Sequence, residues 1–415
     1  MKPRIWLGLG LAIGLPLSAL PACSSDSTAP ASKTIGPGGT GAGGTHDGGT
    51  LLPFTFPGDP GPGGVLFTAS GEVLALGGYA FPPATPTDVA FVDGWDFHFD
   101  EVLVTIDKIT LADNPDKEPG DQAKTDGVIA EVDGPFAIDL HKGGPLAGKG
   151  GSDEQSVPIA ALTNQNKNGG APFDLTRRYA FGFDTVPATK SAQNINLDDA
   201  AQADYAEMIS KGYVVLYVGT ATFKGTACTP SDPEFDKLPK VVKFRLGYKS
   251  PTTYGNCQNP DNDPAKAFAN EEHERGVAFF ANKSAIAQVT IHTDHPFWDS
   301  TAHDSPAHFD QIAARYTGQT GTPTAVLEDF VGVDFLGFKD AQGNKLPWRT
   351  CLSSFMPPDK SAMHFDPMGV PVDPTDTSGS KLRDYADYMT YNQSTQGHLN
   401  SDGLCFVKRN YPSPP

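Results

Sequence analysis

The chain has 415 residues, of which 49 are acidic and 31 are basic, so its formal net charge is −18. Nucleic acids and anionic lipid headgroups bind proteins through a basic face, and this charge balance therefore argues against both as partners. The same balance favours solubility and attracts cations. With 45 glycines and 37 prolines, the chain is expected to contain many turns and short strands rather than long helices.

The first 22 residues have the features of an export signal. Lys2 and Arg4 precede an apolar run over residues 5–20, which is shorter than the roughly 20 residues needed to span a bilayer. Leu20-Pro-Ala-Cys23 then resembles the lipobox of bacterial lipoproteins, in which the cysteine becomes the acylated N-terminus. We therefore expect residues 1–22 to be a lipoprotein signal peptide and Cys23 to be lipidated, with ordinary signal cleavage as the alternative.

The expected location is the cell envelope, with acyl chains as the contact to the membrane. Ser24 after the cysteine resembles lipoproteins that are sent to the outer membrane of Gram-negative bacteria, either on its periplasmic face or on the cell surface. Residues 23–63 are rich in Gly, Ser and Pro and hold few large apolar side chains, so they predict a disordered tether. A Gly-rich coil of this length would reach roughly 35 Å.

The remaining chain predicts a mainly β fold, an antiparallel β-sandwich over residues 64–298. Apolar and polar residues alternate in many short runs separated by turn residues: 95–111, 128–132, 136–140, 179–183, 213–223, 241–246, 277–280 and 287–291. Helical spacing is confined to 197–211, 309–316 and 382–391. Residues 299–415 are therefore expected to form a small, mixed C-terminal subdomain that contains helices and is clamped by disulfides.

Four cysteines remain after Cys23, namely Cys228, Cys257, Cys351 and Cys405. An even number in an exported protein indicates disulfides, and three pairings are possible. We expect the nearest pairs to form, Cys228 with Cys257 and Cys351 with Cys405. A zinc–thiolate site is the alternative, although no Cys-x-x-Cys spacing is present.

Residues 292–308 hold the strongest chemical signal in the chain. Four histidines and several aspartates occur there at short spacing, and the candidate ligands among them are His292, Asp294, His295, His303 and His308. Imidazoles and carboxylates clustered in this way suit Zn²⁺ or Cu²⁺. Two other interpretations stay open: a polar loop whose histidines only cap helices or bind carbonyl oxygens, and a hydrolytic or other catalytic site.

Parts of this region resemble a group of uncharacterised exported proteins and lipoproteins of Gram-negative bacteria. The resemblance is carried by Val289-Thr-Ile-His292-Thr-Asp294-His295-Pro-Phe, by Phe309-Asp-Gln-Ile-Ala-Ala, and by Gln396-Gly-His398-Leu-Asn-Ser-Asp-Gly403-Leu-Cys405. It covers about residues 210–405. It implies that His292, Asp294, His295 and His398 are the residues of interest, and it implies no activity.

Weaker candidates are Met356, Met363, His364 and Met368, which would suit copper but are explained more simply as core methionines and a surface turn. No Gly-x-Ser-x-Gly elbow, Walker loop or His-Glu-x-x-His helix occurs. We assign no catalytic residue, and a non-enzymatic role is favoured over an enzymatic one.

The sequence thus predicts a lipid-anchored envelope protein that binds a transition metal through His292, His295 and either His303 or His308, with Asp294 or His398 completing the ligand set. The alternative is a metal-free adhesion or structural module that binds a protein or glycan and exposes an aromatic patch around Trp298 or Trp348. A third hypothesis is a metal-dependent hydrolase. Convergence of three or more of the candidate ligands within about 5 Å would favour the metal hypothesis.

Overall fold

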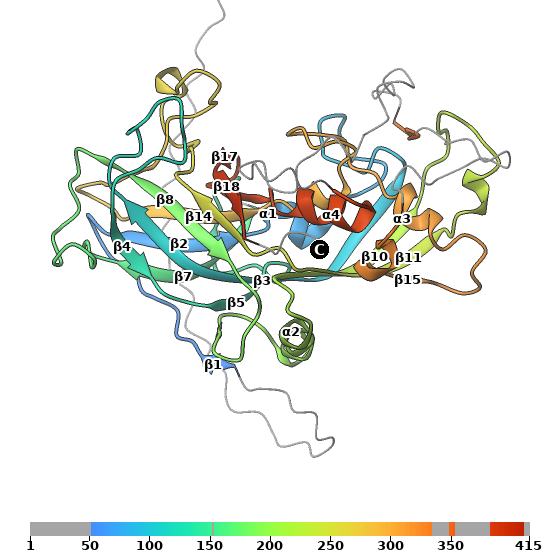
Figure 1. Cartoon of the computed structure of the whole chain (residues 1–415), viewed down its shortest axis with the longest axis horizontal. Coiled ribbons are helices and arrows are strands. Elements are labelled where there is room, and N and C mark those ends of the chain that lie inside the picture. Colours follow the sequence, from blue (N-terminus) through green and yellow to red (C-terminus); the bar gives the residue numbers. More distant parts are fainter. Residues whose placement is uncertain (1–50, 152, 334–347, 353–381, 411–415) are drawn as a thin grey trace, which may run out of the picture. The chain divides into compact units, whose positions relative to one another are not determined.

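The computed structural model describes residues 51–151, 153–333, 348–352 and 382–410, and these form a mainly β protein (Figure 1). Two disulfide bonds join distant parts of this chain. The described residues after Gly48 belong to one compact unit. The predicted fold class is confirmed, except that both sheets are mixed rather than purely antiparallel. No helix in the described ranges is long and apolar enough to cross a membrane.

The first sheet is built around β3 (Trp95–Ala112), whose alternating apolar residues form one 18-residue strand. The sheet follows the order β1-β9-β5-β3-β10-β11-β15, and β4, β8, β12, β13 and β18 join it off this path. The bounds of these strands are β1 (Leu52–Pro53), β4 (Val128–Val132), β5 (Phe136–Asp139), β8 (Arg178–Thr185), β9 (Gln193–Asn194), β10 (Val215–Phe223), β11 (Val241–Tyr248), β12 (Thr252–Gly255), β13 (Val277–Ala278), β15 (Thr324–Val326) and β18 (Phe406–Arg409).

The second sheet carries the residues of interest and has the order β17-β16-β14-β2-β7-β6. Its strands are β2 (Val65–Ser70), β6 (Leu146–Ala147), β7 (Gln155–Leu162), β14 (Ala285–Ile291), β16 (Gly397–Leu399) and β17 (Gly403–Leu404). β14 runs parallel to β2, and the other pairs in this sheet are antiparallel. Strands from early and late parts of the chain therefore belong to one sheet, with β14 between β2 and β16.

The main apolar core draws side chains from both sheets. Val102 and Val104 of β3 belong to it, together with Phe67 of β2, whose ring lies 6.2 Å from that of Phe181 in β8. Burial of such side chains stabilises the fold by roughly 1.5–3 kcal/mol for each large residue. This shared core holds the second sheet in place, and with it the candidate ligands.

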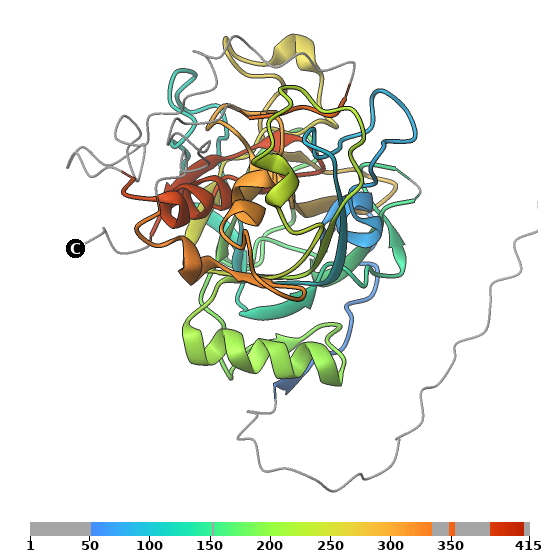
Figure 2. The same ribbon diagram turned by 90° about the vertical axis from the view of Figure 1, so that its right-hand side faces the viewer.

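Helix α2 (Asp199–Lys211) covers the other face of the first sheet. Leu103 of β3 packs there with Tyr205 and Met208 of the helix, and the Tyr205 hydroxyl lies 2.9 Å from the Thr105 hydroxyl. Asp198 caps the N-terminus of the helix, and Gly212 ends it in the left-handed conformation. Figures 1 and 2 show α2 on one side of this sheet and α3 (Asp310–Ala314) and α4 (Tyr385–Gln393) on the other.

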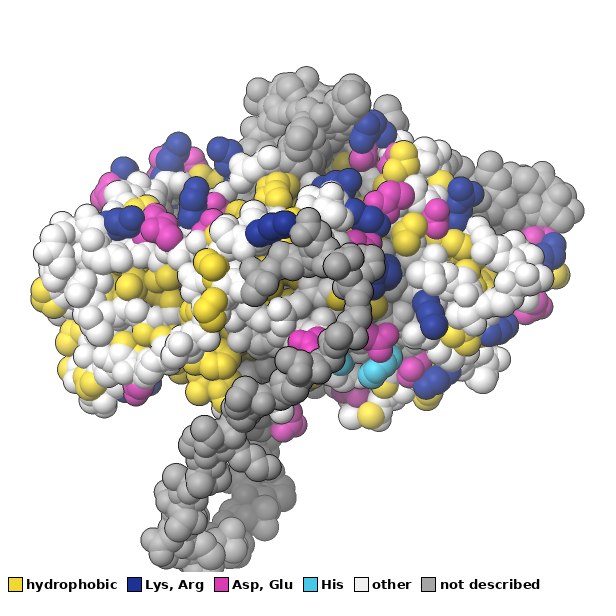
Figure 3. Space-filling view, turned by 90° about the horizontal axis from the view of Figure 1, so that it is seen from below, with side chains coloured by type: hydrophobic (Ala, Val, Ile, Leu, Met, Phe, Trp, Pro, Cys, Tyr) yellow, Lys and Arg dark blue, Asp and Glu magenta, His cyan; other side chains and the backbone are white. Residues whose placement is uncertain are grey.

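The three predicted helices are confirmed as α2, α3 and α4, with shorter bounds at most ends. The other helices within the described residues are α1 (Glu72–Gly77) and the 3₁₀ turns η1 (Phe235–Lys237), η2 (Pro264–Lys266), η3 (His295–Phe297) and η4 (Leu327–Phe330). The surface seen in Figure 3 has lysine and arginine side chains dispersed among aspartate and glutamate side chains.

The last part of the predicted tether lies in the folded unit. Leu51 is buried in the apolar cluster beneath α2, and β1 pairs in parallel with β9. The folded unit therefore begins before the expected end of the tether at residue 63, because Leu51 already packs in this apolar cluster. The division at residue 298 stays a prediction, although β16, β17 and β18 are strands of the same two sheets as the segments before that residue.

The expected disulfide pairing is wrong, because the bonds join Cys228 to Cys351 and Cys257 to Cys405. Strand pairing explains both. The bridge between Thr229 and Thr350 places Cys228 beside Cys351, and the register of β12 with β18 places Cys257 beside Cys405. In a fold with many pairs between distant strands, cysteines that are near in sequence need not be near in space.

Peptide mapping without reduction should recover the Cys228–Cys351 and Cys257–Cys405 peptides. Replacing Cys257 and Cys405 together with Ser should lower the free energy of unfolding by about 2–5 kcal/mol, because the bond closes a long loop in the unfolded chain. Recovery of a Cys228–Cys257 peptide from the natively folded protein would contradict this connectivity.

Candidate metal centre

The candidate ligands meet at the edge of the second sheet where β2 and β14 end and β16 begins. Ser70 of β2 pairs with Thr290 of β14, and because the two strands are parallel, both chains leave the sheet at the same edge. Two residues farther along each chain come Glu72 and His292. The antiparallel β16 places His398 opposite Thr290, which lies on the same face as His292.

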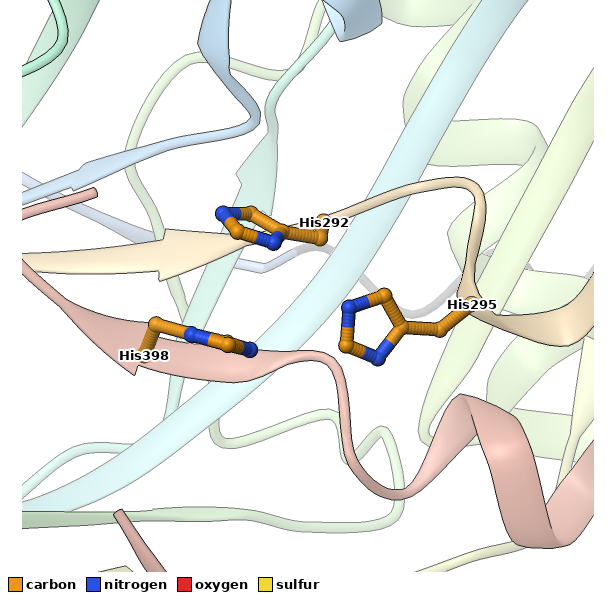
Figure 4. Close-up of side chains that lie close together, drawn as sticks. All are labelled: His292, His295 and His398. Atoms are coloured by element: carbon orange, nitrogen blue, oxygen red, sulfur yellow. The ribbon is translucent and has the colours of Figure 1, made fainter. Parts of the chain in front are cut away.

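The imidazole rings of His292, His295 and His398 surround one point (Figure 4). One nitrogen from each ring lies within 4.8 Å of those from the other two. The ring centroids of His292 and His398 are 4.2 Å apart, and that of His295 is 5.4 Å from each of them. The convergence expected for a metal site is therefore present, and His398 is the third member of the group.

Gly397 allows His398 to reach this position. A Cβ atom at residue 397 would lie 2.6 Å from the ring of Tyr254, so only glycine fits there without a shift of the strand. The Tyr254 hydroxyl donates to the Ser394 carbonyl oxygen in the turn that leads from α4 into β16. The backbone N–H of His292 donates to the Gln396 carbonyl oxygen across the strands.

The hydrogen bonds of His295 leave its Nε2 free to bind a metal. The Thr395 hydroxyl donates to the Asn392 carbonyl oxygen at 2.7 Å, so its oxygen accepts a hydrogen bond from Nδ1 of His295 at 2.8 Å. Nδ1 therefore carries the proton and Nε2 carries the lone pair. That Nε2 is buried and has no hydrogen-bond partner among the described residues.

His398 is fully buried, and neither of its ring nitrogens makes a hydrogen bond of normal geometry with the described residues, although the backbone of Thr395 and Asp402 lies close enough to act on its pKa. Buried polar atoms without partners cost roughly 1–3 kcal/mol each. Burial lowers the pKa of both His295 and His398, and neighbouring imidazoles lower it further. Both rings are therefore neutral at pH 7, which is the state that ligates Zn²⁺ or Cu²⁺.

Glu72 was not among the residues expected from the sequence. Its Oε1 accepts a hydrogen bond from the Ser401 hydroxyl and lies 3.5 Å from Nε2 of His292. The residue has a φ of 59°, a left-handed conformation that is strained for a glutamate. Carboxylates in this relation to a histidine orient the ring and tune its basicity.

Glu72 also changes the protonation of His292. Burial alone would lower the pKa of this imidazole, but the contact with Glu72 and the negative charge of that carboxylate outweigh burial and raise the pKa to about 9. The metal-free His292 is therefore protonated at pH 7, and a metal ion must displace that proton.

A second group of possible ligands consists of Glu72, His292 and Asp402, whose ligand atoms lie within 4.8 Å of one another. This group borders a pocket of about 140 Å³. His292 belongs to both groups. The sequence offered little signal for Glu72 and Asp402, because each is an isolated carboxylate far along the chain from the histidine-rich segment.

Two expected ligands lie beside the three histidines without joining them. Asp294 accepts a hydrogen bond from Nε1 of Trp298 and belongs to neither group. The ring centroid of His303 is 5.9 Å from that of His398, but the residue is partly exposed and contacts Asp304. The structure thus places neither residue among the three converging ligands.

His308, which was also expected among the metal ligands, lies outside the group of His292, His295 and His398. It packs instead against Trp348, with Nε2 lying 3.3 Å from Asp299 and Nδ1 lying 3.9 Å from Asp93. The pairing of Ala307 with Trp298 and Phe91 fixes this position, because it turns residue 308 toward the start of α3.

The other candidates fall outside the site or outside the described residues. Trp298 and Trp348 are 4% and 3% exposed, so neither forms the surface patch that the adhesion hypothesis predicts. Met356, Met363, His364 and Met368 lie outside the described residues, as does Cys23.

Comparisons with known protein families, with curated proteins and with solved structures gave no match for this chain.

The affinity for Zn²⁺ should rise about tenfold per pH unit from roughly pH 7 to 9, because one proton leaves His292 for each ion bound. Above pH 9 this dependence should flatten. Glu72→Gln removes the charge that raises the pKa of His292, so the slope of log affinity against pH should fall in this variant. Competition against a chelator of known pH dependence measures the slope. Equal slopes for Glu72→Gln and the wild type would contradict the assigned role of Glu72.

Proposed function

We propose that this protein is a lipid-anchored protein of the bacterial cell envelope that binds a divalent transition metal through His292, His295 and His398. The convergence of these three imidazoles carries the proposal. The three histidines come from a strand end, a 3₁₀ turn and a neighbouring strand. The fold, and not closeness along the sequence, therefore brings all three together.

The donor set favours Zn²⁺ or Cu²⁺. Imidazole nitrogens suit these borderline ions, whereas Ca²⁺ and Mg²⁺ require oxygen ligands. Cys228, Cys257, Cys351 and Cys405 are held in disulfides and supply no thiolate. Three protein ligands leave one further position on a tetrahedral ion, which water or another side chain can take.

The proposed anchor rests on the N-terminal sequence. Lys2, Arg4 and the apolar run precede Cys23 in the order of a lipoprotein signal, and the Gly-rich segment that follows suits a flexible connection to the folded unit.

The full chain, purified through a tag without histidine, should bind about one Zn²⁺ or Cu²⁺ ion at the three-imidazole group. His398→Ala and His295→Ala should abolish this binding, since each removes one of three ligands. His308→Ala is the matched control, because it also removes a buried imidazole but lies outside the group. Elemental analysis and titration calorimetry measure the result. Undiminished binding by His398→Ala would contradict the proposal.

Binding should also stabilise the folded protein, by about 2.7 kcal/mol when the free ion is at 100 times its dissociation constant. This increase should be seen in the wild type and in His308→Ala but not in His398→Ala. An equal increase in all three proteins would place the ion elsewhere.

Replacing Cys23 with Ala should move the protein from the membrane fraction to the soluble fraction and abolish labelling by a fatty acid. Ser24→Ala is the control and should keep both properties. Continued fatty-acid labelling of Cys23→Ala would show that the anchor is not at this cysteine.

A further inference from the structure

A small pocket lies beside the buried group of His292, His295 and His398. His295 and His398 are 1% and 0% exposed, whereas His292 borders the pocket of about 140 Å³. Among the three imidazoles, His292 alone lines this pocket.

The pocket wall is suited to cations. Glu72, Asp294, Asp304 and Asp402 line it, and no lysine or arginine lies among its described lining residues. Carboxylates gathered in a small cleft raise the local concentration of cations and can increase association rates by about 10- to 1,000-fold.

Within this wall, the ligand atoms of Glu72, His292 and Asp402 lie close enough together to share one ion, and Oε1 of Glu72 also accepts a hydrogen bond from the Ser401 hydroxyl. Nε2 of His292 is buried without a hydrogen-bond partner, and its 3.5 Å separation from Oε1 of Glu72 exceeds a normal hydrogen bond. Two donors on one tetrahedral ion with bonds of about 2.0–2.1 Å lie about 3.3 Å apart. Asp402 supplies a third ligand atom within 4.8 Å of the other two.

We propose that Glu72, His292 and Asp402 form a capture site, which binds an incoming divalent cation and passes it by way of His292 to the buried group of His292, His295 and His398. This inference rests on the proposed metal-binding function and adds the route by which the ion enters. The shared histidine is the element that connects the two sites, because it can exchange its partners from the pocket side to the buried side.

Stopped-flow absorbance with Co²⁺, whose visible bands report binding, tests the capture site on the full chain. Asp402→Asn should lower the association rate constant at least about tenfold. Asp304→Asn should lower it less than about twofold, because Asp304 lines the same pocket and loses the same charge but supplies no ligand atom to either group. The final absorbance of Asp402→Asn should equal that of the wild type, since all three imidazoles of the buried group remain.

Three results would overturn the capture site. An unchanged rate in Asp402→Asn would mean that the ion enters elsewhere. Equal slowing in Asp402→Asn and Asp304→Asn would mean that the pocket acts through net charge alone. A reduced final absorbance in Asp402→Asn would make Asp402 a permanent ligand. After any of these three results, loss of Co²⁺ binding in His398→Ala would still support the metal-binding function. A wild-type protein that binds no Co²⁺ would contradict both proposals.

Discussion

The antiparallel pairing of β14 with β16 is the interaction on which the candidate site depends. It sets Thr290 opposite His398, and the chain then continues for two residues to place His292 against the same imidazole. A slip of one residue in this register would turn His398 to the opposite face of the sheet and remove it from the group. The disulfide between Cys257 and Cys405 ties the segment after β17 to the first sheet and so helps to keep this register.

The same geometry leaves polar atoms in the interior. Nε2 of His295 is buried without a partner among the described residues, and both ring nitrogens of His398 have at most distant backbone groups near them, so these atoms destabilise the fold. Two buried imidazoles in this state are costly, because apolar side chains of similar size would fill the space at lower cost. A bound cation would coordinate these nitrogen atoms, and they would then stabilise the fold instead of destabilising it. It would also join the end of β14, the turn η3 and β16.

Much of the fold could be predicted from the sequence, because alternating apolar residues mark β3, β10 and β14, and helical spacing marks α2. His292 and His295 were identifiable because they lie within one short run of histidines. His398 was identified as a candidate ligand only through the resemblance of short motifs to exported proteins. Local density of histidines could not separate His308 from the ligands, since the turn around Ala307 decides its direction.

The missed residues depend on pairing between distant parts of the chain. Glu72 is 220 residues from His292 in sequence and reaches it only because β2 and β14 are parallel neighbours. The disulfide pairing was predicted wrongly for a related reason, since bridges between Thr229 and Thr350 and between β12 and β18 bring distant cysteines together. Neither long-range pairing leaves a periodic pattern in the sequence.

X-ray absorption at the zinc edge, recorded on the full chain loaded with one equivalent of Zn²⁺, tests the central claim most directly. The account predicts three imidazole nitrogens at about 2.0–2.1 Å, with one further nitrogen or oxygen ligand. Scattering from sulfur at about 2.3 Å, or a shell of oxygen atoms without imidazole, would contradict it.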